Sequence, residues 1–244
     1  MKVYPMAIYK ISYSKKYKRA NVHNFGCNFN CPWCSYKLQG KRCFPKFLSI
    51  NEIKHVLKGL DIDRVHFVGG ELTTYPHLSK LCDFTRHELD VYTKIGHSNG
   101  YNLPPTSVDA ISVSIKSLSE DFYKKYTGKS NKPVLENFKT TYQKGVFVDA
   151  SSVLIPGLVE TREIEKISKF IADVDPQINY HITGYIPVPG NTWRSPTKDE
   201  MENAKTVAEK HLKNVSISWF PSAADYIKMT AENPKYQSIP ISLI

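Results

Sequence analysis

Residues 49–71 read SINEIKHVLKGLDIDRVHFVGGE, and this stretch contains one complete α/β unit. It opens with a capping box, Ser-Ile-Asn-Glu, which predicts a helix over residues 49–60. The β-branched and aromatic run at residues 64–68 predicts a strand. Gly69-Gly70-Glu71 predicts a turn that carries a carboxylate where this strand ends. The stretch therefore indicates an α/β protein.

The same alternation of β-type and helical segments continues along the chain. We predict strands at residues 21–25, 64–68, 91–95, 110–116, 147–155 and 178–186. We predict helices at residues 49–60, 78–87, 134–145, 164–174 and 197–212. Alternating units of this kind build a mostly parallel sheet with right-handed crossovers. Six predicted strands do not support a complete eight-stranded barrel.

Length and composition indicate a single globular domain. The chain has 244 residues, with 41% hydrophobic and 23% charged residues, and it contains no repeat or Gly/Ser-rich linker. Its 15 Tyr and 11 Phe exclude disorder as the main state. No apolar run reaches the ~18 residues of a membrane span, and the N-terminal residues do not resemble a signal peptide. We expect a cytoplasmic protein with a core over about 21–213, an N-terminal arm over 1–20 and a C-terminal extension over 214–244.

The charge balance fits either a solvated basic face or a negatively charged partner. The sequence has 33 Lys+Arg and 23 Asp+Glu, which gives a formal charge of +10. Such a charge suits a nucleic acid, an anionic small molecule or an acidic protein such as an electron carrier. The charge alone does not choose among them, and the sequence contains no nucleic-acid-binding motif.

Three cysteines lie close together in the segment Cys27-Asn28-Phe29-Asn30-Cys31-Pro32-Trp33-Cys34. Soft thiolates select zinc, copper(I) or an iron–sulfur cluster. A structural zinc ion takes four protein ligands, so it would need Cys43 or His23 as well. That alternative is a zinc-stabilised nucleic-acid-binding module. A cubane cluster normally takes four thiolates, so three in one loop leave one iron free. The spacing favours the cluster.

The C-x3-C-x2-C loop, with Trp33 directly before the third cysteine, resembles the signature of radical S-adenosylmethionine (SAM) enzymes. The resemblance implies a [4Fe–4S] cluster held by Cys27, Cys31 and Cys34, with SAM on the fourth iron. It also implies oxygen-sensitive chemistry in which SAM yields methionine and a 5′-deoxyadenosyl radical that abstracts hydrogen from a substrate. The implied electron donor is an acidic protein of the ferredoxin or flavodoxin type. The usual fold of this family, a partial (β/α)6 barrel, agrees with the six predicted strands.

A second motif, Gly69-Gly70-Glu71, begins 35 residues after Cys34. It is similar to the GGE motif with which these enzymes contact the methionine part of SAM. Glycines let a backbone approach a ligand closely, and a carboxylate can pair with an ammonium group. The two motifs together are far more specific than either one alone.

Further segments resemble the activases of glycyl radical enzymes. Ser98-Asn99-Gly100 is similar to the turn after their third strand, and Ser114 to Lys116 occupies the place of their D-L-K pattern. The segment from Val153 to Gly157 resembles the end of their fifth strand. The resemblance implies a set of cofactor-binding residues, namely Trp33, Gly69, Gly70, Glu71, Ser98, Asn99, Ser114, Lys116, Val153 and Tyr185.

Two departures from the activase pattern remove negative charge. Ser114 stands where the pattern has Asp, and His97 stands where activases often carry a carboxylate.

The leading hypothesis is that the chain activates a glycyl radical enzyme by removing a backbone glycine hydrogen. The alternative is radical modification of a small anionic metabolite, a peptide or RNA, and the charge favours it. Among the remaining residues we expect Cys82 to be a core residue, and His181 to be either a substrate contact or a core histidine.

Overall fold

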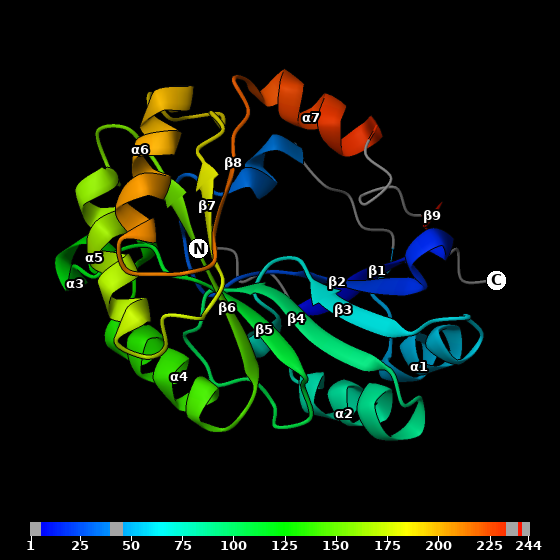
Figure 1. Cartoon of the computed structure of the whole chain (residues 1–244). Helices are drawn as coiled ribbons and strands as arrows, with labels where there is room; N and C mark the ends of the chain where they lie inside the picture. Colours follow the sequence, from blue (N-terminus) through cyan, green and yellow to red (C-terminus); the bar gives the residue numbers. More distant parts are fainter. Residues whose placement is uncertain (1–5, 40–45, 233–238, 241–244) are drawn as a thin grey trace.

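The computed structural model describes residues 6–39, 46–232 and 239–240 and contains one curved sheet (Figure 1). The order of the strands across the sheet is β8-β7-β6-β5-β4-β3-β2-β1-β9. Strands β2 to β8 are parallel to their neighbours, and β1 runs antiparallel to both β2 and β9. The strand bounds are β1 Ala7–Ser14, β2 Arg19–Phe25, β3 Arg64–Val68, β4 Tyr92–Ser98, β5 Ala110–Ser114, β6 Phe147–Leu154, β7 Tyr180–Gly184, β8 Val215–Ser218 and β9 Ile239–Pro240.

This sheet confirms the prediction of an open, mostly parallel partial barrel. The six predicted strands correspond to β2 through β7, and their spatial order follows the chain. The sheet does not close, because β8 and β9 lie at its two ends. Strands β1 and β8 were not predicted, and they lie within the expected N-terminal arm and C-terminal extension.

Helices α1 to α6 cover the convex side of the sheet, whereas α7 lies at its open side (Figure 1). The predicted capping box of Ser49 and Glu52 begins α1. A second capping box, made by Thr197 and Glu200, begins α6 and was not predicted. The predicted helix over 78–87 is divided between α2 and a π-helical turn. The bounds are α1 Ile50–Lys58, α2 Leu78–Asp83, α3 Glu120–Thr127, α4 Lys132–Gln143, α5 Thr161–Ala172, α6 Lys198–Glu209 and α7 Ala223–Glu232, with 3-10 turns at Lys15–Tyr17, Ser35–Gln39 and Leu72–Thr74 and the π turn at Phe84–Glu88.

The core lies between the helices and the convex face of the sheet. In α5, Ile164, Ile167 and Ile171 recur at helical spacing and are fully buried. Each such side chain contributes roughly 2 kcal/mol of transfer free energy. Cys82 in α2 is also fully buried, which confirms that it is a core residue.

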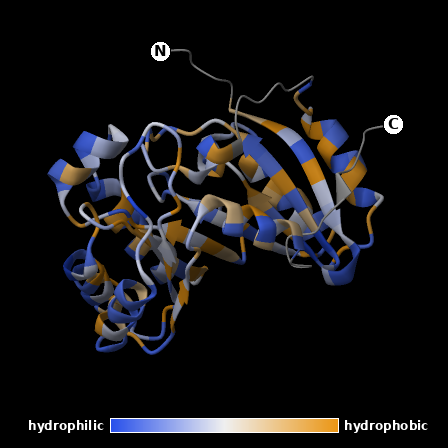
Figure 2. Cartoon of the chain, turned by 90° about the horizontal axis from the view of Figure 1, so that it is seen from above, coloured by the Kyte–Doolittle hydropathy of each residue, from blue (hydrophilic) through white to orange (hydrophobic). Residues whose placement is uncertain are grey.

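The concave face of the sheet is polar. Side chains alternate between the two faces along each strand, and Figure 2 shows the resulting bands of opposite hydropathy. The parallel register places Ser114, Ser151, His181 and Ser216 in one row across β5 to β8. This row faces the lumen of the partial barrel.

The C-terminal segment connects the two ends of the open sheet. After β8 the chain forms α7, and it then pairs with β1 as β9 (Figure 1). In the described ranges, no helix is long and apolar enough to cross a bilayer.

Candidate active site

Buried aromatic and backbone contacts hold the cysteine loop, residues 27–34, directly after β2. The Phe29 ring is buried and meets the Tyr123 ring edge-on, with the ring centroids 6.1 Å apart. The Asn30 N–H donates to the Thr127 carbonyl at 3.1 Å. Both contacts are made by α3, so this helix fixes the loop in place.

Trp33 anchors the other end of the loop in an aromatic cluster. Its ring lies 5.7 Å from Phe122, 5.8 Å from Tyr126 and 6.2 Å from Trp193, measured between centroids. Tyr185 joins this cluster through an edge-on contact with Trp193 at 6.2 Å. Trp33 and Tyr185, both predicted as cofactor-binding residues, are buried here among other aromatic rings.

The glycine pair brings the end of β3 against the end of β2. A Cβ atom on Gly69 would lie 2.5 Å from the Asn24 carbonyl oxygen, and one on Gly70 would lie 1.9 Å from the Gly26 carbonyl oxygen. The next residue, Glu71, donates its N–H to that same Gly26 oxygen at 2.8 Å. Only glycine permits such an approach of two backbones. The sequence predicted that these glycines let the backbone approach a ligand. In the structure they let the end of β3 approach the backbone at the end of β2.

Gly70→Ala should destabilise the protein far more than Gly128→Ala. Both glycines have a left-handed φ, +27° and +79°, but a Cβ on Gly128 would meet no atom within 4 Å. We expect a loss of about 1 kcal/mol at Gly128 from backbone strain and on the order of 3 kcal/mol or more at Gly70, where strain and a clash combine. At 2–4 °C per kcal/mol, thermal unfolding should separate the two variants by several degrees. Equal melting temperatures would contradict the close approach.

Glu71 is fully buried, and its carboxylate accepts four hydrogen bonds from protein groups. Thr73 donates to Oε1 through its N–H at 3.1 Å and its hydroxyl at 2.7 Å. Ser98 Oγ donates to Oε1 at 2.8 Å, and the Asn99 N–H donates to Oε2 at 2.5 Å. Within the described residues no cation pairs with this carboxylate. Glu71 therefore binds the turn after β4, a role that the sequence did not reveal.

Asn99 links that turn to the cysteine loop. Its Nδ2 donates to Asn28 Oδ1 at 2.7 Å and lies 3.8 Å from Cys27 Sγ. Its Oδ1 accepts the Tyr101 N–H at 3.0 Å. The amide is therefore fixed with its donor end toward the cysteines, which brings Cys27, Glu71, Ser98 and Asn99 into one network.

Ser114, Lys116 and Val153 lie at the ends of the next strands. Lys116 Nζ donates to Ser114 Oγ at 2.5 Å, and the Lys116 N–H donates to the Tyr123 hydroxyl at 2.9 Å. Val153 is half-buried in β6 and pairs with Thr183 of β7. No hydrogen bond among the described residues joins these three to the Glu71 network, so they form a second group beside it.

The donor set of the loop fits an iron–sulfur cluster. Cys27 is exposed, and Cys31 and Cys34 are partly exposed. Although Cys27 is exposed, many protein atoms lie around its thiol; they partly desolvate it and raise its pKa to about 11, and desolvation also raises the pKa of Cys31. A metal centre must therefore displace protons when it binds. These three cysteines are the residues that would hold a [4Fe–4S] cluster.

Among the residues that the structure describes, no fourth protein ligand lies beside them. Cys43 lies outside the described residues, and Nε2 of His23 lies 2.9 Å from Ser12 Oγ of β1. Where the structure describes the chain, no three His, Cys, Asp or Glu side chains are gathered as for a single metal ion. A cubane does not require such a group, because each thiolate binds its own iron.

Three parts of the site escaped prediction from the sequence. Helix α3 buries only Tyr123 and Thr127, so its apolar signal is weak, although Ser119 caps it. Asn28 gives no motif signal. His97 was noted only as a departure from a pattern, yet its Nδ1 lies 3.4 Å from Ser151 Oγ on the concave face.

Comparison with known proteins identifies the family. Residues 21–171 match the sequence model of the Radical SAM superfamily. A protein of Methanocaldococcus jannaschii named "Putative glycyl-radical enzyme activating enzyme MJ1632" is 33% identical over 224 residues, which cover 87% of this chain and 84% of that protein. A second protein of that organism, "Putative glycyl-radical enzyme activating enzyme MJ1227", is 25% identical over 232 residues, which cover 85% of this chain and 91% of that protein.

Solved structures show the same fold. SuiB of Streptococcus suis with bound S-adenosylmethionine has a TM-score of 0.63 at 16% identity. The match covers 85% of this chain and 50% of SuiB. QueE of Escherichia coli has a TM-score of 0.56 at 14% identity, covering 88% of this chain and 94% of QueE. The cofactors of the matched superfamily are a [4Fe–4S] cluster and SAM. The chain is an enzyme and belongs to the radical SAM superfamily.

Proposed function

We propose that Cys27, Cys31 and Cys34 hold the cluster and that SAM binds beside them in the network of Glu71 and Asn99. Together the cofactors supply a 5′-deoxyadenosyl radical, which removes a hydrogen atom from a substrate. The observation that carries this proposal is the path from Glu71 through Asn99 to Cys27. It holds the ends of β2, β3 and β4 in one arrangement around the cysteine loop.

The remaining predicted residues have roles in the same site. Gly69 and Gly70 leave backbone free of side chains beside the loop. Lys116 and Ser114 place a cation and a hydroxyl at the end of β5, where the carboxylate of SAM is a suitable partner. Val153 borders the adenosine side. Tyr185 supports this region through the Trp33 cluster.

The first candidate substrate is a glycyl radical enzyme. The names of the two Methanocaldococcus relatives support it. An activase would take the backbone Cα hydrogen of one glycine in its partner. The partner's loop would have to reach the lumen past α7, which lies in the connection between the two ends of the sheet.

The decisive experiment combines the cluster-loaded protein with SAM and dithionite under anaerobic conditions. The proposal predicts 5′-deoxyadenosine and methionine in equal amounts. A glycyl electron-spin signal after addition of a glycyl radical enzyme encoded beside this gene would establish the activase role. Formation of 5′-deoxyadenosine without that signal would restrict the proposal to another substrate. Absence of both products from iron-loaded protein would refute it.

An acidic electron donor, of ferredoxin or flavodoxin type, would dock near the cysteine loop. Lys37 follows the loop and donates to the Pro32 carbonyl at 2.9 Å. Lys125 of α3 stands over the Tyr126 ring, 5.1 Å from its centroid, and Tyr126 contacts Trp33. These cations would steer an acidic protein toward the cluster.

A further inference from the structure

We infer that a cavity on the concave face is the substrate pocket and that it takes a small polar molecule with a carboxylate or phosphate group, which His97 contacts. This inference rests on the proposed hydrogen abstraction and names the substrate class for it. The cavity measures about 660 Å³, within the range of small-molecule sites. The residues of its wall that carry the argument are His97, Ser151, His181, Lys213, Ser216 and Ser218.

The cavity adjoins the proposed radical site at His97, and from there it extends to Asn179 and Lys213, which precede β7 and β8. His97 immediately precedes Ser98 and Asn99, which Glu71 fixes through two hydrogen bonds. The Asn99 amide in turn reaches Cys27. A substrate held by His97 would therefore lie next to the network that surrounds the cysteine loop, as hydrogen abstraction requires.

His97 has a strained backbone that directs its ring into the lumen. Its φ is +52°, in the left-handed region, where the register of β4 against β5 is irregular between Ile95 and Ser98. Strain of this kind in a residue other than glycine is concentrated at functional sites. The ring is accessible from the lumen, and Ser151 Oγ lies 3.4 Å from Nδ1. No hydrogen bond to Nε2 is found among the described residues, so Nε2 can contact a substrate.

The opposite wall is held rigid by three side chains. Ser216 Oγ lies 2.8 Å from His181 Nδ1, and Ser218 Oγ lies 2.9 Å from His181 Nε2. Both ring nitrogens of His181 thus have serine partners. His181 shapes the cavity, whereas His97 offers a nitrogen to what enters it. An apolar molecule would leave His97 Nε2 without a partner.

The charges around the cavity favour an anion. Asp149 also lines the cavity, but it is paired with Lys94, Nζ to Oδ2 at 2.6 Å, so these two charges compensate. Lys213 lines the cavity and has no ion pair within the described ranges. Lys116 adds a positive field at His97. Desolvation lowers the pKa of His97 to about 4, so the ring is neutral near pH 7. Lys116, His181 and Lys94 also lower this pKa, and Asp149 opposes them. A concave site with excess positive charge attracts anions.

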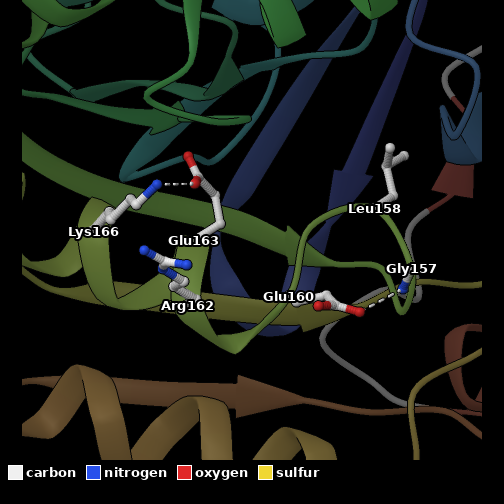
Figure 3. A pocket seen from close by; sticks show the side chains of 6 residues that line it. All are labelled: Gly157, Leu158, Glu160, Arg162, Glu163 and Lys166. Carbon is white, nitrogen blue, oxygen red and sulfur yellow. Dashed lines mark hydrogen bonds and ion pairs between the residues drawn. The ribbon is translucent and has the colours of Figure 1, made fainter.

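A second, shallower pocket at the start of α5 lacks these features (Figure 3). There Lys166 pairs with Glu163 at 3.4 Å, and the Gly157 N–H donates to Glu160 at 3.1 Å. Its lining has two acidic residues, Glu160 and Glu163, and two basic residues, Arg162 and Lys166, so it carries no excess of positive charge.

Chemical modification of histidine tests the inference without turnover. Cluster-loaded protein is treated anaerobically with diethyl pyrocarbonate, and the rate at each histidine is read by peptide mass mapping. Malonate or inorganic phosphate should slow modification of His97 at least fivefold, while neutral malonamide should not. Protection by malonate alone identifies a carboxylate, and protection by phosphate alone identifies a phosphate. His55 and His87, exposed on the outer helical layer, serve as controls and should react at unchanged rates.

Lys213→Gln should raise the anion concentration for half-protection about tenfold, because it removes the basic side chain of the lining. Lys210→Gln, an exposed neighbour at the end of α6, should leave it unchanged. Equal modification of His97 with and without anions, or equal protection by malonamide, would overturn the inference. SAM cleavage is measured separately. Cleavage without anion protection would refute only the substrate class, and protection without cleavage would refute only the proposed function.

Discussion

Cys31→Ala should reduce the formation of 5′-deoxyadenosine from SAM to the rate of the protein-free control. Three cysteines in one loop bind three irons of the cluster, and loss of one ligand leaves two irons without protein thiolates. The variant should contain less iron and lose the brown colour of the cluster. Product is measured by chromatography after anaerobic incubation with dithionite, and iron is measured in the same samples.

Cys82→Ala is the matched control, because it also removes one thiol. Cys82 is fully buried in α2 and packs in the core. Its loss should cost about 1 kcal/mol of stability through a small cavity, with product formation retained. Activity in Cys31→Ala, or an equal loss of activity in folded Cys82→Ala, would show that the cysteine loop is not the cluster site.

Glu71→Ala should both destabilise the fold and weaken SAM binding. The change leaves the buried donors of Thr73, Ser98 and Asn99 without their acceptor. We expect a loss on the order of 3 kcal/mol in the free energy of unfolding and an increase in the dissociation constant of SAM of tenfold or more, about 1.4 kcal/mol. Urea unfolding and calorimetric titration with SAM measure the two effects.

Asp109→Ala separates these two effects. Asp109 accepts the Thr93 N–H at 2.7 Å, so it also joins β4 to its neighbour, but at the opposite end of the strands. This variant should lose stability and keep its affinity for SAM. Unchanged SAM affinity in Glu71→Ala would show that the Asn99 turn does not take part in SAM binding.

The strands that form the centre of the sheet were predictable because their apolar residues recur with the right periodicity. In β3 the buried residues Val65 and Phe67 alternate with less buried ones, and Ala20 and Val22 have the same two-residue spacing in β2. In β1 the buried residues are Ile8, Ile11, Ser12 and Ser14, and the register is irregular between Ile8 and Lys10, so strict alternation is lost. Its place at the end of the parallel series depends on pairing with β2, which no local pattern reveals.

The sequence indicated which residues belong to the site better than it indicated the contacts between them. Glu71 and Ser98 stand out as motif residues, but the hydrogen bond between them joins positions 27 residues apart. It exists because the parallel register brings the ends of β3 and β4 together. His97 had no motif of its own. Its significance emerges from the cavity and from Ser151 on the second strand along, β6.

The central claim is that the cysteine loop leaves one iron of the cluster free for SAM. Electron paramagnetic resonance of the dithionite-reduced, cluster-loaded protein tests it most directly, with spectra recorded with and without SAM. Direct coordination predicts that SAM changes the g values of the reduced cluster. An identical spectrum under conditions in which calorimetry shows SAM to be bound would contradict the claim.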